Sequence, residues 1–168
     1  MLKVQQPQGD TAKISKILVA IDGSLHSMKA VELAIEMSEK EQSNKTEDDD
    51  RGLTALTVLD VSKPRKFLSS FIAAPTYGLR ELDEERNAAK HWMDAVRKKA
   101  EEKKIPFRSE IIEGLVSAEA TIVDYAESHQ IDLIVVGTRG RTGFSKVLLG
   151  SVASRVVEYA HCSVVVVK

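Results

Sequence analysis

The chain has 168 residues, 43% of them hydrophobic and 29% charged, and its formal net charge is −1. This length fits one domain whose core needs neither metal ions nor disulfides. The balanced charge, without a basic stripe, argues against nucleic acid as a partner, because phosphate binding needs clustered Lys and Arg. No run approaches the roughly 20 apolar residues of a membrane span. A polar N-terminus without a signal-peptide pattern and a single cysteine, Cys162, favour the cytoplasm.

The polar residues 1–13 predict a flexible N-terminal tail, followed by a single domain over 14–168. The domain opens with a continuous apolar run at 16–22, which is typical of a strand buried on both faces. From Ser24 the apolar residues change to a helical spacing. The predicted core-facing residues of this first helix are Ala30, Leu33, Ala34 and Met37.

The polar and acidic stretch 42–51 predicts a solvated loop, and the apolar run 53–59 predicts a second buried strand. Residues 62–82 contain two prolines and form no clear pattern, so we expect a partly ordered flap or interface segment there. A long charged helix ends before Pro106, and residues 107–113 alternate as an edge strand does. The apolar face of that helix is predicted to carry Ala89, Trp92, Met93, Val96 and Ala100.

The last third of the chain repeats the alternation of helix and strand. Residues 131–137 and 163–167 are strongly apolar and predict a fourth and a fifth strand. The helices before each of them are marked by Ala118, Ile122, Tyr125 and Ala126, and by Ala153, Val156, Val157 and Ala160.

This order predicts an α/β fold: an open, five-stranded, mainly parallel sheet with helices on both faces. Such sheets bind ligands beyond the carboxyl ends of their strands, where the strand order reverses. The two most apolar strands, at 17–21 and 133–136, are the natural central pair. Because Asp22 and Gly137 terminate them, we expect both residues at the ligand site.

A glycine-rich loop fills residues 137–151. Gly137 is expected to let the chain turn sharply after its strand, and Gly140 to let backbone approach a phosphate. Ser151 is expected to cap the following helix, whose free first-turn N–H groups form an anion site. The arginines that follow these glycines are either phosphate ligands or solvated loop charges, and they are Arg139 and Arg141.

The spacing Gly-x-x-Gly, nine residues, Gly-Ser is neither a Walker A loop nor a dinucleotide-binding fingerprint. It resembles the signature of the universal stress protein family, in its ATP-binding branch. The apolar segment ending in Asp22-Gly-Ser and the terminal valine strand share this resemblance, which extends over 14–168. The resemblance implies a Rossmann-like fold of the adenine nucleotide alpha hydrolase type, with the first and fourth strands side by side.

The same resemblance implies the role of each site residue. It assigns Asp22 to the nucleoside, Ala20 and Val58 to the adenine, and the glycine-rich loop to ribose and phosphates. The nucleotide-binding residues so predicted are Ala20, Asp22, Val58, Val136, Gly137, Arg139, Gly140, Gly150, Ser151 and Val152.

The ligand implied is ATP, or ADP or AMP, with Mg or Mn as a possible companion. The resemblance also implies a homodimer through Val164 to Val167, and we expect a nucleotide-dependent stress-response or signalling switch with an unknown protein partner. Two alternatives remain open: an adaptor of the same fold that binds no nucleotide, and a slow Mg-dependent nucleotide hydrolase.

Catalytic and metal-binding patterns are weak by comparison. Neither Ser24 nor Ser151 has an evident histidine partner, so no catalytic residue is predicted. The histidines are dispersed and lack metal-ligand spacing, so they are expected at the surface. Cys162 is expected to have no redox role, Trp92 to pack in the core, and the acidic run 47–50 to be solvated rather than a metal site.

Overall fold

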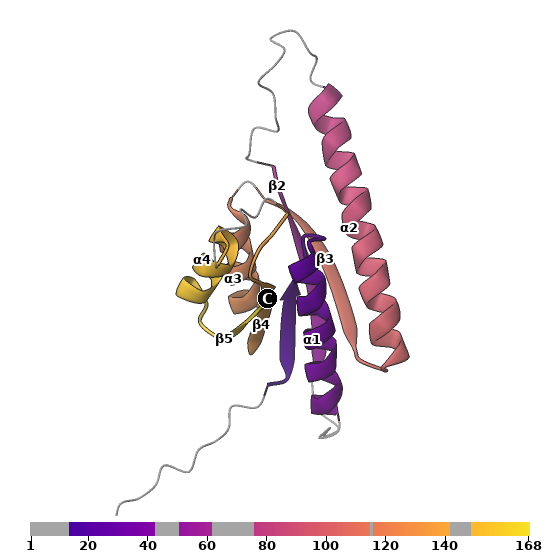
Figure 1. The fold of residues 1–168 in the computed structure, drawn as a ribbon, viewed down its shortest axis with the longest axis vertical. Helices are drawn as coiled ribbons and strands as arrows, with labels where there is room; N and C mark the ends of the chain where they lie inside the picture. The colour runs from indigo at the N-terminus through magenta and orange to yellow at the C-terminus, as the bar shows by residue number, and fades with distance from the viewer. Residues whose placement is uncertain (1–13, 43–50, 62–75, 115, 142–148) are drawn as a thin grey trace, which may run out of the picture.

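The computed structural model of the chain describes residues 14–42, 51–61, 76–114, 116–141 and 149–168. The N-terminal tail at 1–13, the acidic run 47–50, most of the segment predicted as a flap and Gly143 of the glycine-rich loop lie outside these ranges. Helices and strands alternate along the chain (Figure 1). They are β1 (Lys16–Ala20), α1 (Leu25–Gln42), β2 (Gly52–Asp60), α2 (Thr76–Glu102), β3 (Phe107–Gly114), α3 (Ala118–Ser128), β4 (Leu133–Gly137), α4 (Ser151–Tyr159) and β5 (Ser163–Val167).

The strands form one five-stranded sheet in the order β3-β2-β1-β4-β5, and every neighbouring pair is parallel. The α/β prediction and the pairing of the first with the fourth strand are therefore confirmed. The chain leaves β1 toward β2 on one side and returns to β4 on the other, so the order reverses at β1. The carboxyl ends of β1 and β4 thus form the topological switch point of the sheet.

Two hydrophobic cores lie on opposite faces of the sheet, because side chains of successive strand residues point to opposite faces. Figure 1 shows α1 and α2 over one face, and α3 and α4 over the other. In β1, Ile17 and Val19 belong to the core under α1 and α2, while Leu18 and Ala20 belong to the core under α3 and α4. Burial on both faces explains the continuous apolar runs in the central strands.

Helices α2 and α3 end in the same way. Lys104 and Gln130 have positive φ angles of 57° and 54°, and each is followed by an isoleucine. The N–H of Ile105 donates to the Ala100 carbonyl, and that of Ile131 to the Ala126 carbonyl, both at 2.9 Å. These are Schellman motifs, in which the buried isoleucine that follows the turn ties the helix end to the core.

Two predictions about the first helix and the loop after it were wrong in detail. The buried apolar residues of α1 are Ala30, Val31, Ala34 and Ile35. The predicted residues Leu33 and Met37 are only partly buried, so the buried face is rotated about the helix axis relative to the prediction. Arg51, predicted in a solvated loop, is only 4% exposed. Its guanidinium donates to the Glu41 carbonyl near the end of α1, so a cation satisfies that helix terminus.

The segment 62–82, for which the sequence showed no clear pattern, includes the start of a helix. α2 begins at Thr76, and the end that contains its first turns extends beyond the sheet (Figure 1). Its buried residues Ala89, Met93, Val96 and Ala100 are those predicted from the apolar spacing. In α4, by contrast, the predicted core residue Val157 is 49% exposed, and the buried residues of that helix are Ala153 and Val156.

Candidate functional site

Asp22 lies two residues after β1, at the switch point of the sheet. Its carboxylate accepts hydrogen bonds from the backbone N–H of Ser24 and from that of Arg141, both at 3.0 Å. The second bond joins the turn after β1 to the glycine-rich loop after β4, which are 119 residues apart in the chain. The structure therefore brings together the two segments that the sequence placed at one site.

The electrostatics of Asp22 favour a charged carboxylate. Burial alone raises the pKa of this group, but the hydrogen bonds from Ser24, Ser27 and the Arg141 backbone outweigh it, and the pKa of Asp22 lies below its usual value of 3.8. At neutral pH the Asp22 side chain is therefore an anion, which can accept hydrogen bonds but cannot donate them.

Ser24 caps α1 and also reaches the glycine-rich loop. The Ser27 N–H donates to the Ser24 hydroxyl oxygen at 3.2 Å, the geometry of a helix N-cap. The same hydroxyl donates to the carbonyl of Arg139 at 3.1 Å. Because this hydroxyl is tied to backbone groups rather than to a base, it is not arranged as a nucleophile.

The glycines of the loop are needed for close packing, and the reasons differ from those predicted. A Cβ on Gly137 would lie 2.7 Å from the backbone carbon of His26, so this glycine admits the first turn of α1 against β4. A Cβ on Gly140 would lie 2.6 Å from Oδ2 of Asp22. The side of Gly140 that a side chain would fill is therefore occupied by the Asp22 carboxylate, and among the described glycines only Gly23 has a positive φ.

The glycine-rich loop ends where α4 begins. Gly150, not Ser151, is the N-cap of α4, so the prediction that Ser151 caps this helix was wrong. The Gly150 N–H donates to the Thr138 carbonyl at 2.6 Å, which fixes the helix start against the end of β4. Ser151 and Val152 are then the first helical residues, whose N–H groups have no acceptor within the helix. Such a terminus favours an anion.

The apolar residues predicted at the site belong to one cluster, on the sheet face covered by α3 and α4. Ala20 and Val136 are buried in it, and Val58 and Val152 pack against it while partly exposed. Asp22 follows Ala20 by two residues, just beyond the end of β1, so the apolar cluster and the carboxylate both adjoin the carboxyl end of this strand.

The two arginines of the loop are placed differently. Arg139 is half-buried, and its backbone carbonyl is the acceptor for Ser24. The Arg141 side chain is half-exposed and turned toward α2, where its guanidinium carbon lies 5.8 Å from the centre of the Trp92 ring. Trp92 packs against the core under α1 and α2, as predicted. The apolar spacing of the helix did not predict its contact with Arg141.

Other candidate chemistries find no support in the part of the chain that the structure describes. There, no group of three or more His, Cys, Asp or Glu side chains is placed to hold a metal ion. His91, His129 and His161 are exposed as predicted, whereas His26 is half-buried beside Gly137. Burial raises the pKa of the half-buried Cys162 thiol, which lowers its reactivity at neutral pH. Within the same described ranges, no helix is both long and apolar enough to cross a membrane.

Comparisons with known proteins agree with this architecture. A model described as the universal stress protein family matches residues 13–168. Universal stress protein MJ0531 of Methanocaldococcus jannaschii is 38% identical over 155 residues, which cover 91% of this chain and 81% of that relative. The solved structure of universal stress protein UspA from Lactobacillus plantarum is 30% identical with a TM-score of 0.71, covering 94% of this chain and 99% of that one.

A more distant structure shares the fold. It is a universal stress protein family protein from Arabidopsis thaliana, solved with AMP bound. It is 21% identical to this chain, with a TM-score of 0.61, and the match covers 92% of this chain and 91% of that one.

Proposed function

The chain belongs to the universal stress protein family, and from that premise we propose that it binds ATP or a related adenine nucleotide at the carboxyl edge of β1 and β4. The observation that carries this proposal is the bond between the Asp22 carboxylate and the Arg141 N–H. This bond holds the glycine-rich loop against the turn after β1, at the position where open parallel sheets take their ligands. The Asp22 carboxylate, which accepts hydrogen bonds, and the start of α4, which favours an anion, thereby lie at the same end of the sheet.

In this proposal the two ends of the nucleotide meet different chemistry. The Asp22 carboxylate accepts hydrogen bonds from the hydroxyl or amino groups of the nucleoside, since a carboxylate offers acceptors only. The phosphates lie at the start of α4, where the N–H groups of Ser151 and Val152 and the backbone around Gly150 receive them. Arg139 adds positive charge beside them.

The base is assigned to the apolar cluster at the same edge. Ala20, Val58 and Val136 present carbon atoms to a flat, largely apolar ring, and Gly137 and Gly140 keep the surrounding backbone close. The AMP found in the Arabidopsis thaliana relative supports an adenine ligand for this fold. We assign ATP, with ADP and AMP as related ligands and with Mg or Mn as its counterion.

We expect little or no catalysis at this site. Phosphoryl transfer needs a positioned acceptor and a charge clamp on the transferred group. Here the Ser24 hydroxyl is bonded to a backbone carbonyl, and the Asp22 carboxylate is already bonded to two backbone N–H groups. Holding a nucleotide is therefore better supported than hydrolysing one.

Calorimetry on protein stripped of nucleotide tests the proposal with ATP, ADP and AMP. We expect saturable heat and a matching thermal shift. The Gly140→Val variant should lose both, because its Cβ would displace the Asp22 carboxylate. No heat and no thermal shift at millimolar nucleotide would overturn the proposal and favour the adaptor alternative. Product release with Mg or Mn above the background rate would favour the hydrolase alternative.

The assembly and the biological role extend the proposal. β5 lies at the edge of the sheet, and its residues Val164 to Val167 are only partly buried in the single chain. We propose that two copies pair through this strand in the cytoplasm, and that nucleotide occupancy switches the binding of a protein partner in a stress or signalling response.

A further inference from the structure

The indole of Trp92, on α2, lies against the backbone of the turn between β1 and α1. A Cβ built on Gly23 would stand 2.1 Å from Cζ2 and 2.7 Å from Cη2 of Trp92, so only glycine fits beneath the ring. The φ angle of Gly23 is +77°, a conformation that other residues rarely adopt. Trp92 therefore covers the residue that separates Asp22 from Ser24.

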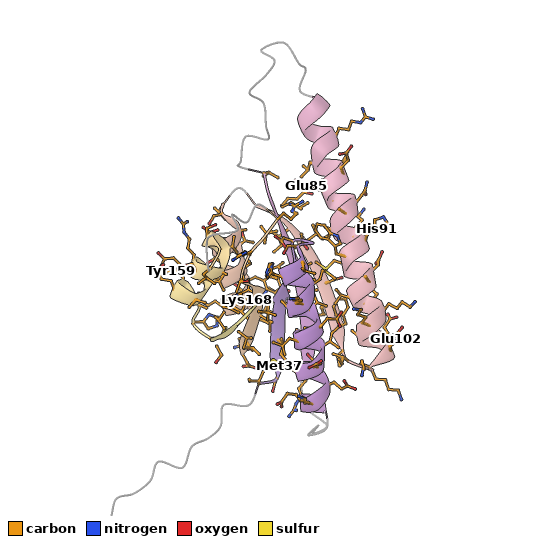
Figure 2. The ribbon with its side chains drawn as sticks, in the orientation of Figure 1. Met37, Glu85, His91, Glu102, Tyr159 and Lys168 are labelled. Carbon is orange, nitrogen blue, oxygen red and sulfur yellow. The ribbon has the colours of Figure 1, made fainter. Side chains whose placement is uncertain are left out.

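Trp92 also contacts the second loop of the site. The Arg141 guanidinium carbon lies 5.8 Å from the centre of its ring, within the range of a cation–π interaction. Nη2 of Arg141 lies 3.8 Å from Oε1 of Glu85, which precedes Trp92 by two turns on the same face of α2. Figure 2 shows Glu85 on α2 near the carboxyl ends of the strands. The side chain of Arg141 is thus held by α2, while its backbone N–H holds Asp22.

These contacts make Trp92 a link between both loops and one helix. We propose that Trp92 is a positioning residue of the nucleotide site. Through its contacts with Gly23 and Arg141, it holds the turn after β1 and the glycine-rich loop at the distance from each other that nucleotide binding requires. Because Trp92 belongs to α2, the same contacts couple nucleotide occupancy to this helix. This inference rests on the proposed function and adds the helix through which that site is coupled to the rest of the molecule.

The energetic reason is preorganisation. Each loop must be ordered when a ligand binds, and contacts that order the loops beforehand remove this entropic cost from binding. α2 can supply such contacts because Ala89, Met93, Val96 and Ala100 anchor it in the core independently of Trp92. The coupling is reciprocal, so a ligand that orders the loops must also act on the surroundings of Trp92.

The test uses the Trp92→Phe variant, because a phenyl ring is too short to reach both Gly23 and Arg141. The matched control is His91→Ala, at the neighbouring exposed position of α2, whose side chain points away from the sheet (Figure 2). We expect Trp92→Phe to weaken ATP binding by about five- to tenfold in calorimetry, at the low end of typical site coupling. His91→Ala should bind as the wild type does.

A spectroscopic readout separates positioning from general stability. Trp92 is the only tryptophan of the chain, so intrinsic fluorescence reports on this residue alone. We expect ATP to change the emission with the midpoint found by calorimetry. Arg141→Ala, which keeps the backbone N–H but removes the guanidinium, should reduce that change. Emission that stays constant while calorimetry shows saturation would overturn the coupling.

Amide hydrogen exchange tests whether Trp92 positions the two loops when no nucleotide is bound. In the ligand-free protein, Trp92→Phe should speed amide exchange in peptides covering 22–24 and 137–141, and leave the peptide of α3 unchanged. Unchanged exchange in both loops would overturn the inference. A wild-type chain that gives no heat with ATP would instead overturn the proposed function, while the exchange result would still decide whether Trp92 positions the loops.

Discussion

Asp22 serves two purposes at the scale of single residues. It accepts the Ser24 N–H next to the start of α1, and it accepts the Arg141 N–H of the glycine-rich loop. The first bond is the structural role open to any carboxylate near a helix start, and the second is what brings the two loops together. Because one carboxylate carries both bonds, its charge should support the fold as well as the site.

Acid should reveal the structural part of this role. The pKa of Asp22 lies below its usual 3.8 in the folded chain, so the carboxylate contributes stability that is present above the unfolded pKa and lost as the pH falls through the folded one. We expect the difference in free energy of unfolding between wild type and Asp22→Asn to stay constant from about pH 7 to 5 and to shrink below about pH 4. Urea unfolding across this pH range measures it.

The matched control is Asp124→Asn, an exposed aspartate of α3. Its substitution should leave the pH profile of the wild type unchanged. A wild-type advantage over Asp22→Asn that is the same at pH 3 as at pH 7 would contradict the role given to this carboxylate.

Two glycines of the glycine-rich loop have neighbours that are distant in the sequence. The spacing of Gly137, Gly140 and Gly150 pointed to a segment that the structure places beside Asp22, but it did not show what each glycine faces. Gly137 admits the first turn of α1, and Gly140 faces Asp22. These neighbours come from positions more than 100 residues away, so no local pattern could name them. The sequence did not predict the positive φ of Gly23 or its contact with Trp92, which both require glycine.

At the scale of elements, the start of α4 shows how local structure bears on the proposed phosphate site. Gly150 is its N-cap, with φ −70° and ψ 160°, and Ser151 is the first helical residue. The predicted cap was one residue too late. This difference matters because it makes the N–H of Ser151, and not only its hydroxyl, available to an anion.

Ser151→Pro should separate the fold of α4 from its function. Proline is accepted at the first helical position, and the extended conformation of Gly150 suits a residue that precedes proline. The substitution removes one N–H donor and the hydroxyl. We expect an unchanged circular dichroism spectrum and a loss of about ten- to a hundredfold in ATP affinity by calorimetry, the effect of one charge-assisted hydrogen bond.

Ser151→Ala is the companion variant, because it removes the hydroxyl and keeps the N–H. It should bind ATP more tightly than Ser151→Pro does. If Ser151→Pro bound ATP as tightly as the wild type, the start of α4 would not be the phosphate site.

At the scale of the whole molecule, β5 is the last strand on its side of the sheet, and no other strand of the described ranges pairs with its outer side. Val167 offers its carbonyl to the Thr138 N–H, on the side of β4. Because backbone groups of successive strand residues point to opposite edges, the N–H of Val166 points away from β4. Val166→Pro therefore removes an outward donor and leaves the bonds to β4 in place.

If two copies pair through β5, Val166→Pro should convert the dimer to a monomer of unchanged helical content. Light scattering coupled to size exclusion measures the mass, and circular dichroism checks the fold. Val166→Ala keeps the N–H and should remain dimeric. A Val166→Pro variant that keeps the mass of the wild type would show that pairing, if present, uses another surface.

The sequence alone was enough to predict the α/β sheet, the neighbouring β1 and β4, and the meeting of the Asp22 turn with the glycine-rich loop, because these depend on apolar runs, helical spacing and glycine positions along the chain. Only the tertiary structure showed the Asp22–Arg141 bond, the buried Arg51 and the contact of Trp92 with Gly23. Those contacts join segments that are distant in the sequence, and they depend on how helices and loops pack across the sheet. Local patterns fix each element, whereas packing decides which side chains meet.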